Sequence, residues 1–197
     1  MIIGLTGGIA SGKSTVVEMI KEVGYKVIDA DQLVHDMQAK GGRLYRALHD
    51  WLGEDILLSD GELNRPKLGK LIFSSEEMRH QSAEIQGKII REELAAKRDC
   101  LAKEEDVFFM DIPLLIENDY QDWFDQIWLV AVSPEVQDQR LMKRNHLSAE
   151  EADMRIASQV PLSEKLPYAS LVIDNNGSID DLKERVKSAI KDLANLL

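Results

Sequence analysis

The chain lacks several features that would place it in a particular class of protein. It contains one cysteine, Cys100, among 197 residues, which excludes an internal disulfide and a Cys-x-x-Cys metal site. No apolar run approaches the ~18 residues that a membrane-spanning helix needs, and no basic stretch followed by an apolar one resembles a secretory signal. There is also no internal repeat and no low-complexity tract. We therefore expect a cytoplasmic protein with no membrane partner.

Positive charge is scarce as well. The chain has 24 Lys and Arg against 35 Asp and Glu, which gives a formal net charge of −11. Proteins that bind nucleic acid or an anionic membrane surface usually present a basic face, so neither partner is expected. The hydrophobic fraction of 44% is ordinary for a globular protein. The length predicts a single domain, residues 1–197, with room for an insertion.

The most informative stretch lies near the N-terminus. Residues 7–14 read Gly-Gly-Ile-Ala-Ser-Gly-Lys-Ser and fit Gly-x4-Gly-Lys-Ser, the phosphate-binding P-loop. An apolar run precedes it, and residues 16, 17, 20 and 23 place apolar side chains at helical spacing behind it. The alternative is a plain Gly-rich turn, which this strand-and-helix context disfavours. The chain is therefore predicted to bind a nucleotide.

The positions of this loop have different predicted roles. Lys13 would reach the β- and γ-phosphates, and the Ser14 hydroxyl would bind Mg²⁺. Glycines let backbone N–H groups face inward, where they and the helix N-terminus bind an anion. The other loop residues assigned to ATP are Gly8, Ala10, Ser11, Gly12 and Thr15.

The remaining pattern predicts an α/β fold. Short apolar segments alternate with helical stripes, which indicates a parallel sheet with helices on both faces. The five predicted strands are residues 1–6, 25–28, 107–110, 126–132 and 170–174. Residues from about 40 to 105 contain no convincing core strand, and we predict a helical insertion over about 35–105 that binds a phosphate acceptor. A lid is expected over 139–164, which leaves about 1–34, 106–138 and 165–197 as the core.

Two carboxylates follow predicted strands, at the edge where an open α/β sheet binds its ligands. Asp111 ends the third strand as a Walker-B aspartate does, and that residue holds Mg²⁺ directly or through water. Many strands end in aspartate, so the pattern is weak by itself. Asp31 follows the second strand, and it could equally be the N-cap of the next helix.

Four further polar residues are candidates for the site, and each also has a plain structural interpretation. Arg140 and Arg144 share a helix face, either as a solvated surface beside Asp138 or as a lid that clamps phosphates. Without further information, Arg65 has the plain interpretation of an exposed first-turn arginine, and Asn175 that of a simple turn residue.

Several classes of P-loop protein can be compared with these features. A GTPase should carry an Asn-Lys-x-Asp run, and the sequence has none; the Asp-x-x-Gly at residues 50–53 lies in a helical pattern. A transport ATPase would carry a Gly-rich signature, which is also missing. The pattern alone leaves a non-catalytic nucleotide sensor open. A small-molecule kinase, built like the nucleoside-monophosphate kinases, fits best.

The chain also resembles the dephospho-CoA kinase family nearly from end to end. The matching segments are residues 1–14, 28–31 with 34–35, 63–65 with 68 and 72–73, 111–117, 139–141 with 144, 155–156 with 159, and 173–175 with 177–178. One departure is Gln86-Gly87, where the family commonly carries a His-Pro pair; it bears on local helix geometry and CoA-side contacts. The resemblance implies transfer of the γ-phosphoryl group of ATP to the ribose 3′-hydroxyl of dephospho-CoA, the last step of coenzyme A biosynthesis.

The resemblance also implies roles for individual residues. Asp31 would accept or orient the proton of the 3′-hydroxyl, and Thr6 would lie near the acceptor phosphates. Arg65 and Arg140 would bring positive charge to the acceptor and the γ-phosphate. The assigned sites are, for catalysis, Asp31, Lys13 and Arg140; for ATP, the loop residues with Arg144 and Asn175; for the acceptor, Thr6, Asp31, Arg65 and Asp111; and for Mg²⁺, Ser14 and Asp111. We expect a monomer or weak homo-oligomer. The alternatives are a kinase of another small acceptor, such as a nucleotide or sugar acid, and the sensor.

Overall fold

The structure is a computed structural model that describes residues 1–196. It divides into two compact units, one formed by Met1–Asp29 with Ala102–Leu197 and the other by Ala30–Leu101. We call them the core unit and the inserted unit. The lid segment predicted over 139–164 belongs to the core unit; because its first helix begins at Pro134, we call residues 134–164 the lid from here on.

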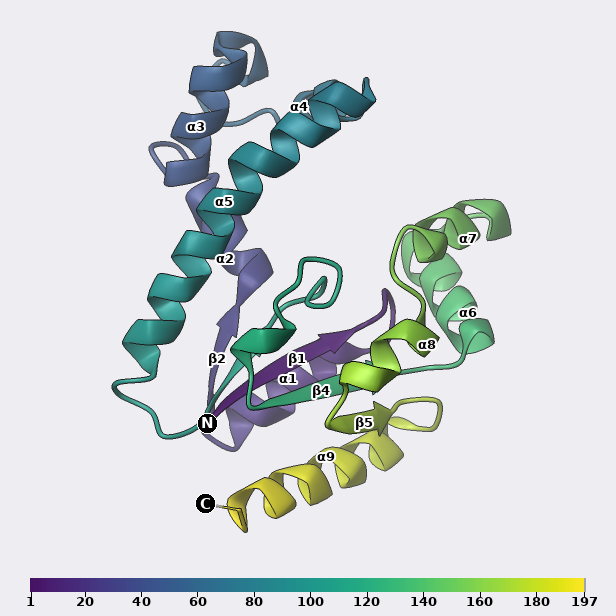
Figure 1. Cartoon of the computed structure of the whole chain (residues 1–197). Helices are drawn as coiled ribbons and strands as arrows, with labels where there is room; N and C mark the ends of the chain where they lie inside the picture. The colour runs from purple at the N-terminus through teal and green to yellow at the C-terminus, as the bar shows by residue number, and fades with distance from the viewer. Residues whose placement is uncertain (197) are drawn as a thin grey trace. The chain divides into compact units, whose positions relative to one another are not determined.

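The core unit is built on a five-stranded parallel sheet (Figure 1). Its strand order is β2-β3-β1-β4-β5. The strands are β1 (Ile2–Gly7), β2 (Lys26–Asp29), β3 (Phe108–Asp111), β4 (Gln126–Ala131) and β5 (Leu171–Asp174). Leu5 pairs with Asp111 and Gly7 with Val130, so the carboxyl ends of the central strands lie at one edge. The predicted fold class is confirmed, and each strand lies within a residue or two of its predicted position.

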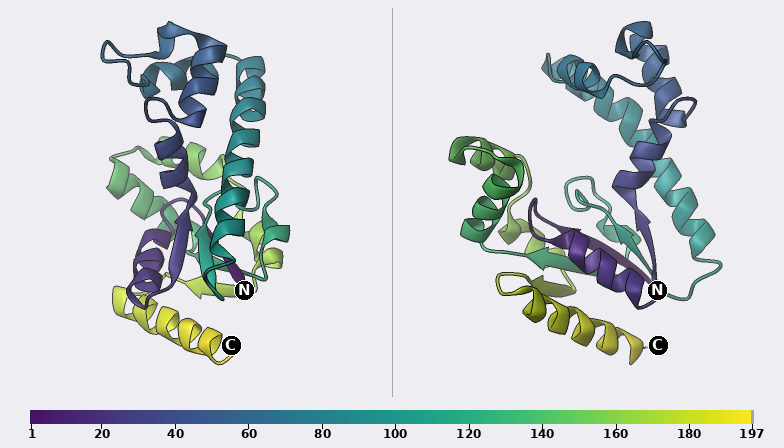
Figure 2. Two further views of the ribbon diagram at one scale, coloured as in Figure 1. Left: turned by 90° about the vertical axis from the view of Figure 1, so that its left-hand side faces the viewer. Right: turned by 180° about the vertical axis from the view of Figure 1, so that it is seen from behind.

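Helices α1 (Lys13–Glu22) and α9 (Ile179–Ala194) pack together against the sheet. Their apolar stripes bury Val16, Ile20 and Val186 completely, because each recurs on the helix face turned to the strands. Phe109 and Trp128 fill the sheet side of this layer, with ring centroids 5.1 Å apart in an edge-to-face arrangement. Figures 1 and 2 show α8 (Leu162–Lys165) on the opposite face of the sheet from α1.

Local capping sequences explain where the lid helices begin. Ser133 caps α6 (Pro134–Asn145), accepting a hydrogen bond from the N–H of Val136. Ser148 and Glu151 form a reciprocal capping box at α7 (Ala149–Ala157). Both helix starts therefore follow from short local sequences.

The inserted unit is helical, as predicted. It contains α2 (Ala30–Met37), α3 (Arg43–Leu52), α4 (Arg65–Ile72) and α5 (Glu76–Leu101). A small core of its own forms from Leu48, Ile56, Leu63 and Leu68. Asn64 caps α4, and its side chain accepts a hydrogen bond from the N–H of Lys67. The unit therefore has a packed interior as well as regular helices.

Across residues 1–196, no helix combines the length and apolar character needed to cross a membrane.

Candidate active site

The P-loop connects β1 to α1 and contains two residues in the left-handed region. Gly12, directly before α1, has φ +86° and ψ 19°, and Ala10 has φ 59°. A left-handed conformation is easy for glycine, whereas for alanine it costs about 1–2 kcal/mol. The N–H of Ser11 donates to the Gly8 carbonyl at 3.1 Å, which tightens the turn. Such strain is typical of a backbone held in shape for a ligand.

Lys13 and Asp111 form an ion pair beside this loop. Lys13 opens α1, whereas Asp111 ends β3, the strand next to β1. The Asp111 residue is buried, so its carboxylate relies on protein partners rather than on bulk water. The structure thus brings together the P-loop lysine and the strand-ending aspartate of the sequence prediction.

The oxygen donors of this region suit Mg²⁺. Ser14 offers an exposed hydroxyl and Asp111 a carboxylate. Within residues 1–196 no cluster of three or more His, Cys, Asp or Glu side chains could hold a metal alone. Mg²⁺ usually takes one or two protein ligands and completes its shell with water and substrate phosphates. The residues present therefore fit this ion.

Thr6 is buried near the end of β1, with 1% of its surface exposed. Its hydroxyl donates to the carbonyl of Pro113 at 3.0 Å. The side chain thus ties β1 to the segment that follows Asp111. Its expected contact with the acceptor phosphates stays a prediction.

Asn175 lies immediately after β5 and supports the P-loop from one side. It is 7% exposed, and its side-chain N–H donates to the Ser11 carbonyl at 2.7 Å. Its own carbonyl accepts a hydrogen bond from Arg140 at 2.9 Å. Asn175 therefore supports the P-loop from the turn after β5, and its expected contact with ATP stays a prediction.

Arg140 is half-buried on α6, and its described hydrogen bond goes to the β5–α9 turn rather than to Asp138. Arg144 is exposed, and its Nε donates to the Asn145 side chain at 2.8 Å. The two arginines share a helix but have different surroundings. The structure holds Arg140 beside the P-loop support and leaves Arg144 at the surface.

The turn after β5 is held by carboxylates. The backbone N–H of Asn176, followed by its side chain, lowers the pKa of Asp174 by hydrogen bonding to the carboxylate. Ser178, first through its hydroxyl and then through its N–H, lowers the pKa of Asp181 in the capping box of α9. These bonds favour the ionised forms and fix the turn that carries Asn175.

Two predicted site residues belong to the inserted unit. Asp31 is the exposed second residue of α2, and Asp29, two residues earlier, ends β2 at the carboxyl edge of the sheet. Since α2 begins at Ala30, the alternative of Asp31 as an N-cap is wrong. Arg65 is exposed at the start of α4, and its Nε donates to Gln38 at 3.3 Å.

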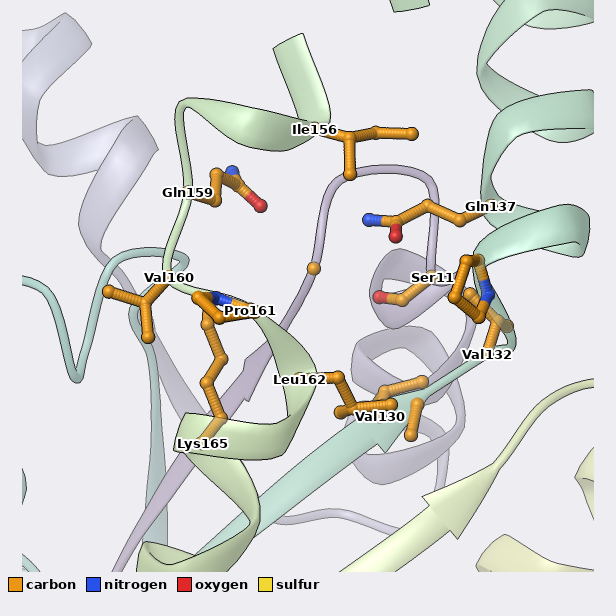
Figure 3. Close-up of a pocket in the computed structure, with 13 residues that line it drawn as sticks. Ser11, Val130, Val132, Gln137, Ile156, Gln159, Val160, Pro161, Leu162 and Lys165 are labelled. Carbon is orange, nitrogen blue, oxygen red and sulfur yellow. The ribbon is translucent and has the colours of Figure 1, made fainter. Parts of the chain in front are cut away.

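Sequence reasoning missed a pocket of about 140 Å³ in the core unit (Figure 3). The P-loop contributes Gly8 and Ser11 to its wall, and the lid contributes Gln137 and Gln159. Lys165 also lines it, 2% exposed, with its ammonium 2.6 Å from the Glu117 carboxylate. Glu117 and Gln159 stood within segments of the family resemblance, whereas nothing in the sequence pointed to Gln137 or Lys165.

With this geometry in place, comparison with known proteins is decisive. A family model described as dephospho-CoA kinase matches residues 1–181. The chain belongs to the dephospho-CoA kinase family. It is 88% identical to a dephospho-CoA kinase of Streptococcus thermophilus over the full length of both chains. Since the family consists of kinases, the chain is a phosphotransferase.

Solved structures agree with this membership. Dephospho-CoA kinase from Campylobacter jejuni superimposes with a TM-score of 0.77 at 27% identity, covering 98% of this chain and 97% of the other. Shikimate kinase from Bacteroides thetaiotaomicron has a TM-score of 0.54 at 15% identity, covering 98% of each chain, and supports the fold alone. The dephospho-CoA kinase family thus shares its architecture with another P-loop kinase.

Proposed function

We propose that this protein transfers the γ-phosphoryl group of ATP to the ribose 3′-hydroxyl of dephospho-CoA, the last step of coenzyme A biosynthesis. The family match over residues 1–181 is the observation that carries this proposal. The strained P-loop with its Lys13–Asp111 pair supplies the matching site for a nucleoside triphosphate.

Phosphoryl transfer asks the protein mainly to position the reactants and to stabilise charge. The loop amides and Lys13 would hold the phosphates of ATP, with Lys13 exchanging its pairing with Asp111 for one with phosphate oxygens. Ser14 and Asp111 would hold Mg²⁺, which neutralises developing charge on the phosphates when it is bound. Arg140 would add a guanidinium at the transferring group.

The acceptor roles belong to Asp31, Arg65 and Thr6. Asp31 would accept the proton that the 3′-hydroxyl loses as its oxygen attacks the γ-phosphorus, and ADP would be the leaving group. Its exposed position on α2 supports this proposal, because the carboxylate is open to an incoming substrate. Arg65 and Thr6 would contact acceptor phosphates.

An ADP-release assay with ATP and Mg²⁺ tests this function. The acceptor panel should contain dephospho-CoA, a nucleoside monophosphate and a sugar acid, with a reaction lacking acceptor as control. We expect release with dephospho-CoA alone, and ³¹P NMR of the product should place the new phosphate on the ribose 3′-oxygen. Release with a different acceptor would indicate another small-molecule kinase, and no release with any acceptor would indicate a nucleotide sensor.

A further inference from the structure

The backbone of Ile9, in the middle of the P-loop, is held on both sides by glutamine side chains. Gln137, on α6, donates from Nε2 to the Ile9 carbonyl at 2.9 Å. Gln159, two residues beyond the end of α7, accepts from the Ile9 N–H through Oε1 at 2.9 Å. Figure 3 shows both amide ends turned toward the P-loop. We refer to these two side chains as the glutamine clamp.

The chemistry of the backbone fixes which way round each amide must be. A backbone N–H can only donate and a carbonyl can only accept. Gln137 must therefore present its NH₂ group to Ile9, whereas Gln159 must present its oxygen. The two glutamines are alike in size and composition but have opposite hydrogen-bonding roles.

The clamp fits closely against the loop. A Cβ built on Gly8 would lie 2.8 Å from Nε2 of Gln137, so a side chain at position 8 would displace the clamp. The segment carrying Gln159 is also held by Glu117, which lies in the segment after β3. Glu117 accepts a hydrogen bond from the N–H of Val160 at 3.2 Å and pairs with the buried Lys165. A buried ion pair of this kind favours one arrangement of the chain, because moving either partner leaves a charge unpaired.

We propose that Gln137 and Gln159 are positioning residues for ATP, through which the lid sets the conformation of the P-loop. Gln159 occupies the N–H of Ile9, so phosphate binding depends on amides further along the loop. Those amides follow Ala10, whose left-handed conformation requires an external restraint. The clamp supplies that restraint from both ends of the lid. The inference rests on the proposed binding of ATP at the P-loop.

Paired substitutions separate this role from a general effect on folding or charge. Gln137→Glu replaces the donor by an acceptor that faces the Ile9 carbonyl, whereas Gln159→Glu keeps an acceptor for the Ile9 N–H. Both variants place a carboxylate at nearly the same site, so charge repulsion of ATP is common to both. Gln139→Glu, exposed on the same helix, controls for added charge on the lid. Gln137→Met removes the donor without adding charge.

The measurements are Kd for ATP by calorimetry, steady-state KM and kcat, and the melting temperature without ligand. Leaving the part-buried Ile9 carbonyl without its donor corresponds to about a tenfold rise in Kd. We expect Gln137→Glu to raise the Kd for ATP at least about tenfold more than Gln159→Glu does, with Gln137→Met also raising it. The KM for ATP should rise by a larger factor than kcat falls.

Equal Kd values for the two glutamate variants, together with an unchanged Kd in Gln137→Met, would overturn the inference. So would variants that melt earlier yet bind ATP as tightly as the wild-type protein. If Gln137→Glu does not fold, the comparison of Gln137→Met with the wild type decides the outcome. Failure of the wild-type protein to bind ATP would instead refute the proposed function together with the clamp.

Discussion

Replacing Gly12 by alanine imposes two separate costs on the P-loop. The residue has φ +86°, where an L side chain is strained. In addition, the new Cβ would lie 2.2 Å from the side-chain nitrogen of Asn175, far inside van der Waals contact. Asn175 would have to move and would lose its 2.7 Å hydrogen bond to the Ser11 carbonyl.

The two costs add in Gly12→Ala, and a second variant, Asn175→Ala, isolates one of them. The backbone strain costs about 1–2 kcal/mol, and the broken buried hydrogen bond costs about 1–3 kcal/mol. Gly12→Ala should therefore lower the free energy of unfolding by about 2–5 kcal/mol. Asn175→Ala removes only the bond and should cost about 1–3 kcal/mol. The double variant should be no less stable than Gly12→Ala, so the coupling energy is about −1 to −3 kcal/mol.

Urea unfolding without nucleotide, followed by far-UV circular dichroism and tryptophan fluorescence, measures all three variants. Gly24→Ala is the matched control, because Gly24 has φ +106° but no atom within 4 Å of an added Cβ. Gly24→Ala should lose unfolding free energy through backbone strain alone, and its effect should add to that of Asn175→Ala without coupling. Strict additivity of Gly12→Ala and Asn175→Ala, within about 0.5 kcal/mol, would refute the contact between these two residues.

Three further predictions concern the chemistry and the pH dependence. Asp31→Asn should lower kcat by about two orders of magnitude and leave the calorimetric Kd for ATP nearly unchanged; undiminished turnover would remove Asp31 from the base role. Arg140→Ala should cost about 1 kcal/mol of stability in urea, through its lost bond to Asn175, but reduce kcat far more; a large stability loss with normal kinetics would reverse this assignment. The pKa of Asp181 in the folded protein lies below its ordinary value of 3.8. The ionised carboxylate therefore adds to the free energy of unfolding above that pH, and this stabilisation is lost as the pH falls through the folded pKa. Asp181→Asn should therefore show a shallower loss of unfolding free energy than the wild type between about pH 5 and pH 3.

The features that the sequence predicted well depend on local rules. The strand before Gly7 and the helix after Gly12 follow from apolar periodicity. Lys13 and Asp111 come together because the carboxyl ends of adjacent parallel strands share one edge.

The features that were missed depend on contacts between distant parts of the chain. The Asn175 side chain bonds to Ser11, 164 residues away, and no periodicity connects the two. Gln159 and Ile9 are separated by 150 residues, so the glutamine clamp could not be predicted from local sequence either. The wrong N-cap alternative for Asp31 has a smaller cause, since helix ends vary by one or two residues. The residue roles at the site stay predictions that the variants above address.

The position of the inserted unit in the chain has a consequence for how this enzyme could change. It connects β2 to β3, which are adjacent and parallel, and parallel neighbours need a crossover of a dozen or more residues in any case. The entropy of closing a loop grows only by about 0.6 kcal/mol for each doubling of its length. Because the unit also has its own apolar core, a longer crossover destabilises the sheet only slightly. If this unit carries the proposed acceptor contacts of Asp31 and Arg65, a lineage could replace it and acquire a new substrate while the P-loop stays intact.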